Sequence, residues 1–141
     1  MLAKQSKIDL DRYVGLWHQV ASFPAWFQQG CSDVTAMYKK VKDYISVFNS
    51  CNTKLGTKSS AFGRAYPSTK NSLKVSFFPL VSADYIIEFV DTGYNYAVVG
   101  SQEKKYLWIL SRKRAIKPAI YDELVSIAKK KGYDVSRLVK G

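Results

Sequence analysis

The stretch "VGLWHQVASFPAWFQQGC", residues 14–31, contains four large aromatic residues: Trp17, Phe23, Trp26 and Phe27. The preceding "DLDRY" predicts a short helical turn, because an aspartate at its start can accept hydrogen bonds from free backbone amides. "LWHQVASF" then predicts extended structure, in which rings and β-branched side chains pack well. The chain is therefore expected to begin with a helical turn that leads into a strand rich in aromatic residues.

Short predicted strands continue as far as Arg112. "DVTAMYKK" and "YISVFNSC" flank "VKD" and predict a hairpin, and five further strands follow: "AFGRAY", "SLKVSFF", "DYIIEFV", "YAVVG" and "KYLWILSR". Eight strands, at about 15–112, favour an all-β meander that closes into a barrel, because closure removes both exposed edges. Such an interior can hold one small ligand. The aromatic stripes fit a filled core as well as the wall of a pocket.

The pattern changes after the last strand. "KPAIYDELVSIAKKKGY" has Pro118 in its first turn, apolar residues at three- and four-residue spacing, and Gly132 just beyond its lysines. It predicts one amphipathic helix at about 118–131, and a short closing strand is expected at about 134–138. We expect residues 1–141 to form a single domain.

The composition describes a folded and strongly basic chain. Of its 141 residues, 47% are hydrophobic and 14% aromatic, and the formal net charge is +11. This composition excludes a disordered chain. The charge attracts nucleic acid, anionic lipid or other acidic partners, although scattered solvated lysines give the same count. The tract "RKRAIK" at 112–117 could contact phosphates, but no nucleic-acid motif accompanies it, so no nucleic acid is expected as a partner.

The start of the chain, "MLAKQSKIDLD", lacks the apolar segment and cleavage pattern of a signal peptide. Two locations are therefore expected. The protein is secreted, periplasmic or peripheral to a membrane if a signal peptide has been removed, and it is cytoplasmic if Met1 is the native start.

Side chains suited to catalysis or metal binding are few. Cys31, Cys51 and the single histidine, His18, are too few for a structural zinc site of about four ligands, so neither a metal nor a cofactor is expected. His18 has no evident nucleophile or carboxylate partner, and Asp84 and Glu88 share a strand face without a visible substrate cleft. We therefore expect no enzyme. Whether Glu88 points into the barrel stays open.

Three segments together resemble the signature regions of the lipocalin family. They are "GLW" with Gly15 and Trp17, Asp91 in "DTGYNYAVV", and "YLWILSR" ending at Arg112. The likeness is greatest to the group of bacterial outer-membrane lipocalins, plant temperature-induced lipocalins and apolipoprotein D. It implies an eight-stranded antiparallel up-and-down β-barrel with a short N-terminal 3₁₀ helix and one C-terminal α-helix packed outside. It also implies that Arg112 stacks on Trp17 across a closed end, where Gly15 permits close backbone approach.

The resemblance also implies a set of site residues. Those expected to face the cavity and bind a ligand are Val34, Ala36, Tyr38, Val47, Asn49, Val75, Phe77, Tyr106 and Trp108. Those expected at the open mouth are Phe23, Trp26 and Phe27. In most relatives Tyr-Glu follows the signature tryptophan, whereas this chain has His18 and Gln19 there.

The expected function is the binding and transport or storage of a small hydrophobic or amphipathic ligand, such as a fatty acid or a lysophospholipid. Tyr38, Asn49 and Tyr106 would orient its polar end. The alternatives are a basic barrel that binds nucleic acid or anionic membrane surfaces, and a lipid-modifying lipocalin enzyme. We expect a monomer or weak homodimer, with peripheral contact to an anionic membrane as a further option.

The pairing of Cys31 with Cys51 depends on the register of the first hairpin. If the hairpin is centred on Val41, opposed residue numbers sum to 82 and the two cysteines face each other, which permits a disulfide. A slip of one residue sends them to opposite faces. The family assignment, with Tyr38 and Val47 both inward, favours the slipped register unless a bulge intervenes, so the bond stays open.

Overall fold

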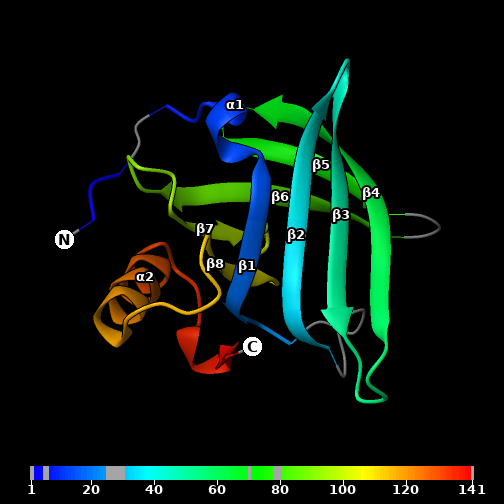
Figure 1. Cartoon of the computed structure of the whole chain (residues 1–141). Coiled ribbons are helices and arrows are strands. Elements are labelled where there is room, and N and C mark those ends of the chain that lie inside the picture. The colour runs from blue at the N-terminus through cyan, green and yellow to red at the C-terminus, as the bar shows by residue number, and fades with distance from the viewer. Residues whose placement is uncertain (1, 5–6, 25–30, 70, 78–80, 141) are drawn as a thin grey trace.

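A computed structural model describes residues 2–4, 7–24, 31–69, 71–77 and 81–140, with the backbone alone for Thr69, Phe77 and residues 81–83. Within these ranges the chain forms a curved sheet with one longer helix beside it (Figure 1). The elements are α1 (Leu10–Tyr13), β1 (Gly15–Ser22), β2 (Ser32–Val41), β3 (Tyr44–Asn52), β4 (Lys58–Thr69), β5 (Ser72–Phe77), β6 (Val81–Val90), β7 (Tyr96–Gly100), β8 (Leu107–Ser111), α2 (Pro118–Lys130), the 3₁₀ helix η2 (Val135–Arg137) and β9 (Val139–Lys140).

The sheet closes on itself. Each strand from β1 to β7 pairs antiparallel with the next, and β1 also pairs with β8. β9 pairs with Ala21 and Ser22 at the end of β1. The predicted eight-stranded antiparallel barrel with a helix outside is therefore confirmed. Within the described residues, no helix has the length and apolar content needed to cross a membrane.

Two apolar cores lie on the two sides of the barrel wall. The inner core contains Tyr13, Trp17, Tyr38, Ile45, Val47, Ala65, Leu73, Val75, Tyr85, Ile87, Val90, Tyr94, Ala97, Val99 and Leu110. The outer core joins the wall to α2 and contains Ala21, Phe23, Phe89, Val98, Leu107, Ile109, Leu124, Ala128 and Tyr133. The aromatic residues of the sequence are thus distributed between the outer core and the inner core.

Two expected elements differ in the structure. The N-terminal turn is α-helical instead of 3₁₀, because Tyr13 N donates to Asp9 O at 3.0 Å and Val14 N donates to Leu10 O at 3.1 Å. The strand expected at about 134–138 is replaced by η2, and the closing strand β9 begins only at Val139. The side chain of Asp134 accepts from the backbone amide two residues on, which favours a turn over extended structure.

The register of the first hairpin also differs from the one centred on Val41. Tyr38 lies opposite Val47, and Val41 lies opposite Tyr44, so opposed residue numbers sum to 85. The turn consists of Lys42 and Asp43 alone. The register centred on Val41 has an even sum of 82, so the observed register differs from it by an odd number of residues. β2 and β3 therefore follow the slipped type of register, with Tyr38 and Val47 on the same face of the sheet.

Candidate functional site

The end of the barrel beside α1 is closed by Trp17 and Arg112. The indole is fully buried, and its Nε1 donates to Tyr13 O at 2.7 Å. The Arg112 guanidinium lies over the indole ring at 3.8 Å from the centroid. Its Nη1 donates to Leu16 O and its Nε to Tyr94 O, both at 3.0 Å. The guanidinium therefore satisfies backbone carbonyls that the turn into β1 would otherwise leave without donors.

Gly15 and Asp91 support this closed end. Gly15 has φ +109°, and a Cβ there would lie 3.2 Å from Nη1 of Arg112. Both the left-handed backbone conformation and the lack of space therefore favour glycine at this position. The buried Asp91 carboxylate accepts from the amides of Asn95 at 2.7 Å and Tyr96 at 2.8 Å, which fixes the turn between β6 and β7. These residues hold the scaffold together.

Three buried tyrosines, Tyr13, Tyr38 and Tyr85, fill the interior next to this end. Tyr13 and Tyr85 share a hydrogen bond between their hydroxyls, and the rings of Tyr38 and Tyr85 meet edge to face at 5.9 Å. Burial raises the pKa of Tyr38 to about 12, and it raises the pKa of Tyr13 and Tyr85 well above the ordinary tyrosine value. This trio forms a neutral, hydrogen-bonded floor.

Toward the end of the barrel away from α1, the inward face carries stacked aromatic rings and becomes partly accessible to solvent. Tyr106 stacks on Trp108 at 5.7 Å, and Trp108 in turn stacks on Tyr85 at 6.4 Å, so rings run continuously from the start of β8 down to the tyrosine floor. Trp108 and Ala36 pack on the inner core but stay partly accessible, and so does Asn49, which lies opposite Ala36. Solvent thus reaches the inward face in the half of the barrel away from α1.

Of the other residues expected in the cavity, Val47 and Val75 are buried in the inner core. Val34 lies where β1 and β2 separate, and it lines a cleft outside the barrel that is described below. The backbone of Phe77 pairs with Gly63, but its side chain lies outside the described residues.

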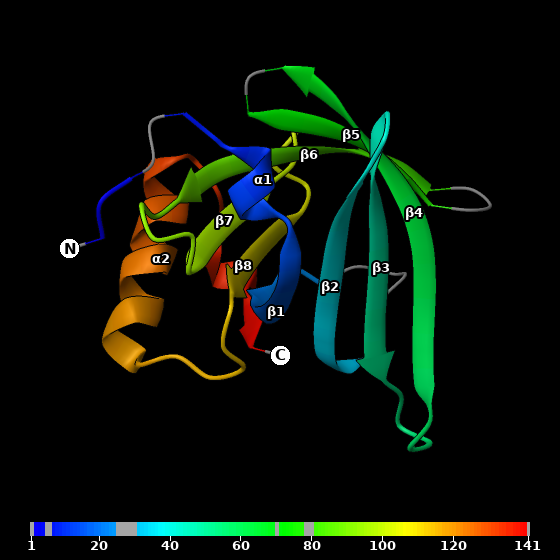
Figure 2. The same ribbon diagram turned by 45° about the horizontal axis from the view of Figure 1, so that its top comes forward.

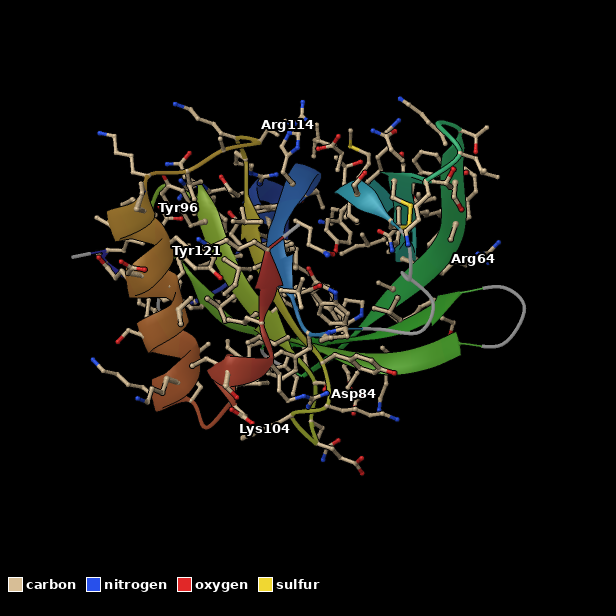
Figure 3. The ribbon with its side chains drawn as sticks, turned by 90° about the horizontal axis from the view of Figure 1, so that it is seen from below. Arg64, Asp84, Tyr96, Lys104, Arg114 and Tyr121 are labelled. Atoms are coloured by element: carbon tan, nitrogen blue, oxygen red, sulfur yellow. A yellow bond between two sulfur atoms is a disulfide. The ribbon has the colours of Figure 1, made fainter. Side chains whose placement is uncertain are left out.

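A disulfide joins Cys31 to Cys51, with the two Cα atoms 5.4 Å apart (Figure 3). The register of the hairpin alone would send the two side chains to opposite faces. An irregularity between Ser32 and Thr35, where Asp33 adopts φ +50°, changes the alternation and brings Cys31 to the face of Cys51. The structure therefore combines the slipped register with a bulge.

Of the three residues expected at the open mouth, the structure describes only Phe23. Phe23 is 1% exposed, and its ring lies in the outer core at 6.4 Å from Tyr133, with the Arg137 guanidinium 4.7 Å from its centroid. The Phe23 ring, which was expected at the open mouth, therefore packs in the outer core, because an irregularity in β1 between Gln19 and Ala21 turns the following side chains. Trp26 and Phe27 lie outside the described residues.

Polar groups considered for catalysis lie on the outer side. Glu88 accepts from the hydroxyl of Tyr133 at 2.7 Å, which settles that it points toward α2 and away from the interior. Burial and this carboxylate raise the pKa of Tyr133. Asp84 pairs with Lys74 and points away from the barrel (Figure 3). Among the described residues, no hydrogen bond joins His18 to a hydroxyl or carboxylate, and no three potential metal ligands gather.

A cleft that the sequence did not reveal lies between β1, β9 and the start of α2. It has a volume of about 360 Å³, and its walls include His18, Val20, Ile116, Tyr121 and Lys140. The Arg114 guanidinium, which also lines it, pairs with Asp33 at 2.7 Å. Residues from four distant segments meet here, so no single motif could have predicted it.

Comparison with known proteins agrees with this geometry. Residues 8–141 match the model of the lipocalin-like domain. The chain is 36% identical to the outer membrane lipoprotein Blc of Vibrio cholerae, over 95% of this chain and 82% of the relative. It is also 36% identical to temperature-induced lipocalin-1 of Arabidopsis thaliana, over 94% of this chain and 78% of the relative. In fold it is similar to lobster apocrustacyanin A1, with a TM-score of 0.78, 20% identity, and coverage of 92% of this chain and 77% of that one. The chain therefore belongs to the lipocalin family.

Proposed function

We propose that the protein binds one small hydrophobic or amphipathic molecule inside the barrel and carries or stores it. The observation that carries this proposal is the contrast between the two halves of the inward face. Near α1 the interior is filled by Trp17 and the tyrosine trio, whereas Ala36, which lies opposite Trp17, and Asn49 and Trp108 remain partly accessible. A filled core would bury all inward side chains alike.

The chemistry of these residues favours an acyl chain with a polar end. An apolar tail would lie against Val47 and Trp108, where burial contributes roughly 25 cal/mol per Å² before the cost of association. Asn49 and Tyr106 lie nearer the open end and would orient a carboxylate or phosphate headgroup. The hydroxyl of Tyr38 is engaged with Tyr85 in the floor, so we assign it a lesser share in headgroup binding than the sequence suggested. Fatty acids and lysophospholipids both fit this arrangement.

Two alternatives receive less support. A phosphate-binding role for residues 112–117 would rest on Lys113 and Lys117 alone, because Arg112 lies on Trp17 and Arg114 pairs with Asp33. An enzyme would need a nucleophile or an acid-base pair inside the barrel, and Glu88 lies on the outer side. We also propose a location at a membrane, since one relative is named an outer membrane lipoprotein.

The test is a titration of the protein with oleate, followed by tryptophan emission. We expect a saturable change, because Trp108 lies on the inward face. Ala36→Trp narrows the interior and should weaken oleate binding at least tenfold. Ala119→Trp adds the same ring to the exposed side of α2 and should leave the affinity unchanged. Absence of saturation in the wild type, or equal affinities for the two variants, would overturn the proposal.

A further inference from the structure

The barrel has one wall that no described helix covers. α2 lies beside β7 and β8, whereas β2, β3 and β4 form the opposite side of the barrel in both views (Figures 1 and 2). An exposed face of an antiparallel sheet normally carries polar side chains, while the apolar ones point inward. The outward positions of this wall depart from that rule.

Four apolar side chains line up across this wall. Leu16 lies opposite Met37, Met37 opposite Phe48, and Phe48 opposite Phe62. Because neighbouring strands lie about 4.8 Å apart, this apolar row extends for about 14 Å across β1 to β4. The row is defined by Leu16, Met37, Phe48 and Phe62.

The two ends of the apolar row are open to solvent, and Met37 and Phe48 between them are half-buried. Phe62 is 69% exposed and Leu16 is 40% exposed. The Phe62 ring contacts Phe48 at 4.6 Å between centroids, so the two rings shield each other only in part. Their apolar area lies outside both cores and does little to stabilise the barrel. A contiguous apolar row that is exposed at both ends and half-buried between them is typical of an interaction surface.

The side chains around the apolar row are basic or aromatic. In the adjacent row, Lys39 lies opposite Ser46, which lies opposite Arg64. Arg64 points away from the barrel, with its guanidinium 4.6 Å from the ring of Tyr44 (Figure 3). β3 and β4 contain no acidic residue, and the single one in β2, Asp33, is paired with Arg114. Asp43 lies in the turn between β2 and β3, and Asp11 pairs with Lys40, but among the described residues no carboxylate pairs with Lys39 or Arg64.

We propose that this wall binds the surface of an anionic lipid bilayer, with the apolar row inserted at the headgroup boundary. Anionic headgroups would supply the negative charges that Lys39 and Arg64 lack, and phenylalanine rings gain from leaving water at that depth. Tyr44 and Tyr66, whose rings lie 5.9 Å apart, suit the same interface because each has an apolar ring and a polar tip.

A second copy of the chain is a poorer occupant. Two such walls placed face to face would bring together two sets of cations, while the only acid within β2 to β4, Asp33, is already paired with Arg114, in chains whose formal charge is +11 each. The bilayer contact uses the outside of the wall and does not depend on whether the interior holds a ligand.

The experiment is flotation of the purified chain with vesicles of phosphatidylcholine, with and without about 30% phosphatidylglycerol, whose negative surface potential attracts basic segments. Phe62→Ser should lower binding to the anionic vesicles at least fivefold, and Arg64→Ser should lower it about threefold. The matched controls are Val139→Ser, an apolar residue 56% exposed on β9, and Lys129→Ser on α2. Both controls should bind as the wild type does.

Four outcomes would overturn the proposal. They are no binding by the wild type, equal binding to neutral and anionic vesicles, an equal loss in the Val139→Ser control, and a wild-type dimer that Phe62→Ser dissociates while vesicle binding persists. The last outcome would assign the wall to a second copy of the chain. The Ala36→Trp variant should still float with the vesicles, so a failure of oleate binding and a failure of membrane binding can be told apart.

Discussion

At the scale of single residues, Arg112 is the side chain on which most of the closed end depends. It stacks on Trp17 and donates to carbonyls of the α1 turn, of the start of β1 and of the turn before β7. One planar side chain thus joins three parts of the backbone that are far apart in the sequence. Lysine keeps the charge but cannot reach these carbonyls in several directions at once.

We therefore predict that Arg112→Ala lowers the free energy of unfolding by about 4 kcal/mol and Arg112→Lys by about 2 kcal/mol, because the stack on the buried Trp17 is lost or weakened and several backbone carbonyls lose their donors. Arg114→Ala is the matched control. Its pair with Asp33 is exposed, so the loss should stay below about 1 kcal/mol. Urea denaturation measures all three. Equal losses for Arg112→Ala and Arg114→Ala would show that the stack contributes little.

At the scale of elements, the floor of the barrel joins α1, β2 and β6 through Tyr13, Tyr38 and Tyr85. Each phenol is buried, and the pKa of each is raised relative to that of an exposed tyrosine. Between pH 10 and pH 12 the unfolded chain loses these protons while the folded chain keeps them. The folded state then binds more protons than the unfolded state, so stability falls as the pH rises through this range.

The expected slope is about 1.4 kcal/mol per pH unit for each buried tyrosine of the trio. Tyr38→Phe should make the slope of the free energy of unfolding against pH shallower by about 1.4 kcal/mol per pH unit, the contribution of one proton, because one of the three groups no longer titrates. Urea denaturation between pH 9 and pH 12, with tyrosinate absorbance recorded in parallel, measures both effects. Ionisation of all 10 tyrosines near pH 10 in a chain that remains folded would contradict this account.

The elements also show what the sequence could predict. The order of short strands and the three signature segments predicted the barrel, its closed end and α2, because each depends on a local pattern. The register of β2 and β3 stayed open between two types, because "VKD" does not show that Lys42 and Asp43 alone make the turn. The bulge at Asp33, which decides where Cys31 points, leaves no pattern in the alternation either.

The candidate site was predicted less completely than the fold. The inward positions of Ala36, Asn49 and Trp108 follow from the family pattern, but the outward turn of Phe23 depends on an irregularity in β1. The apolar row was invisible because it takes one residue from each of four strands. On any one strand, a single exposed apolar side chain is ordinary and predicts nothing.

At the scale of the whole molecule, three regions have different chemistry. The end next to α1 is closed by aromatic rings, the interior of the other half is accessible, and the wall of β2 to β4 carries the apolar row on its outside. A protein that lies on an anionic surface through this wall keeps α2 turned away from the lipid (Figure 2). Membrane contact and ligand binding would then use separate surfaces of one barrel.

The central claim is that the ligand lies inside the barrel, and one measurement tests it most directly. Crystals of the protein grown with a bromine-labelled fatty acid should show the anomalous signal of bromine on the inward side, beside Ala36 and Trp108. A bromine position in the outer cleft beside His18 and Lys140, with protein side chains filling the interior, would contradict the account.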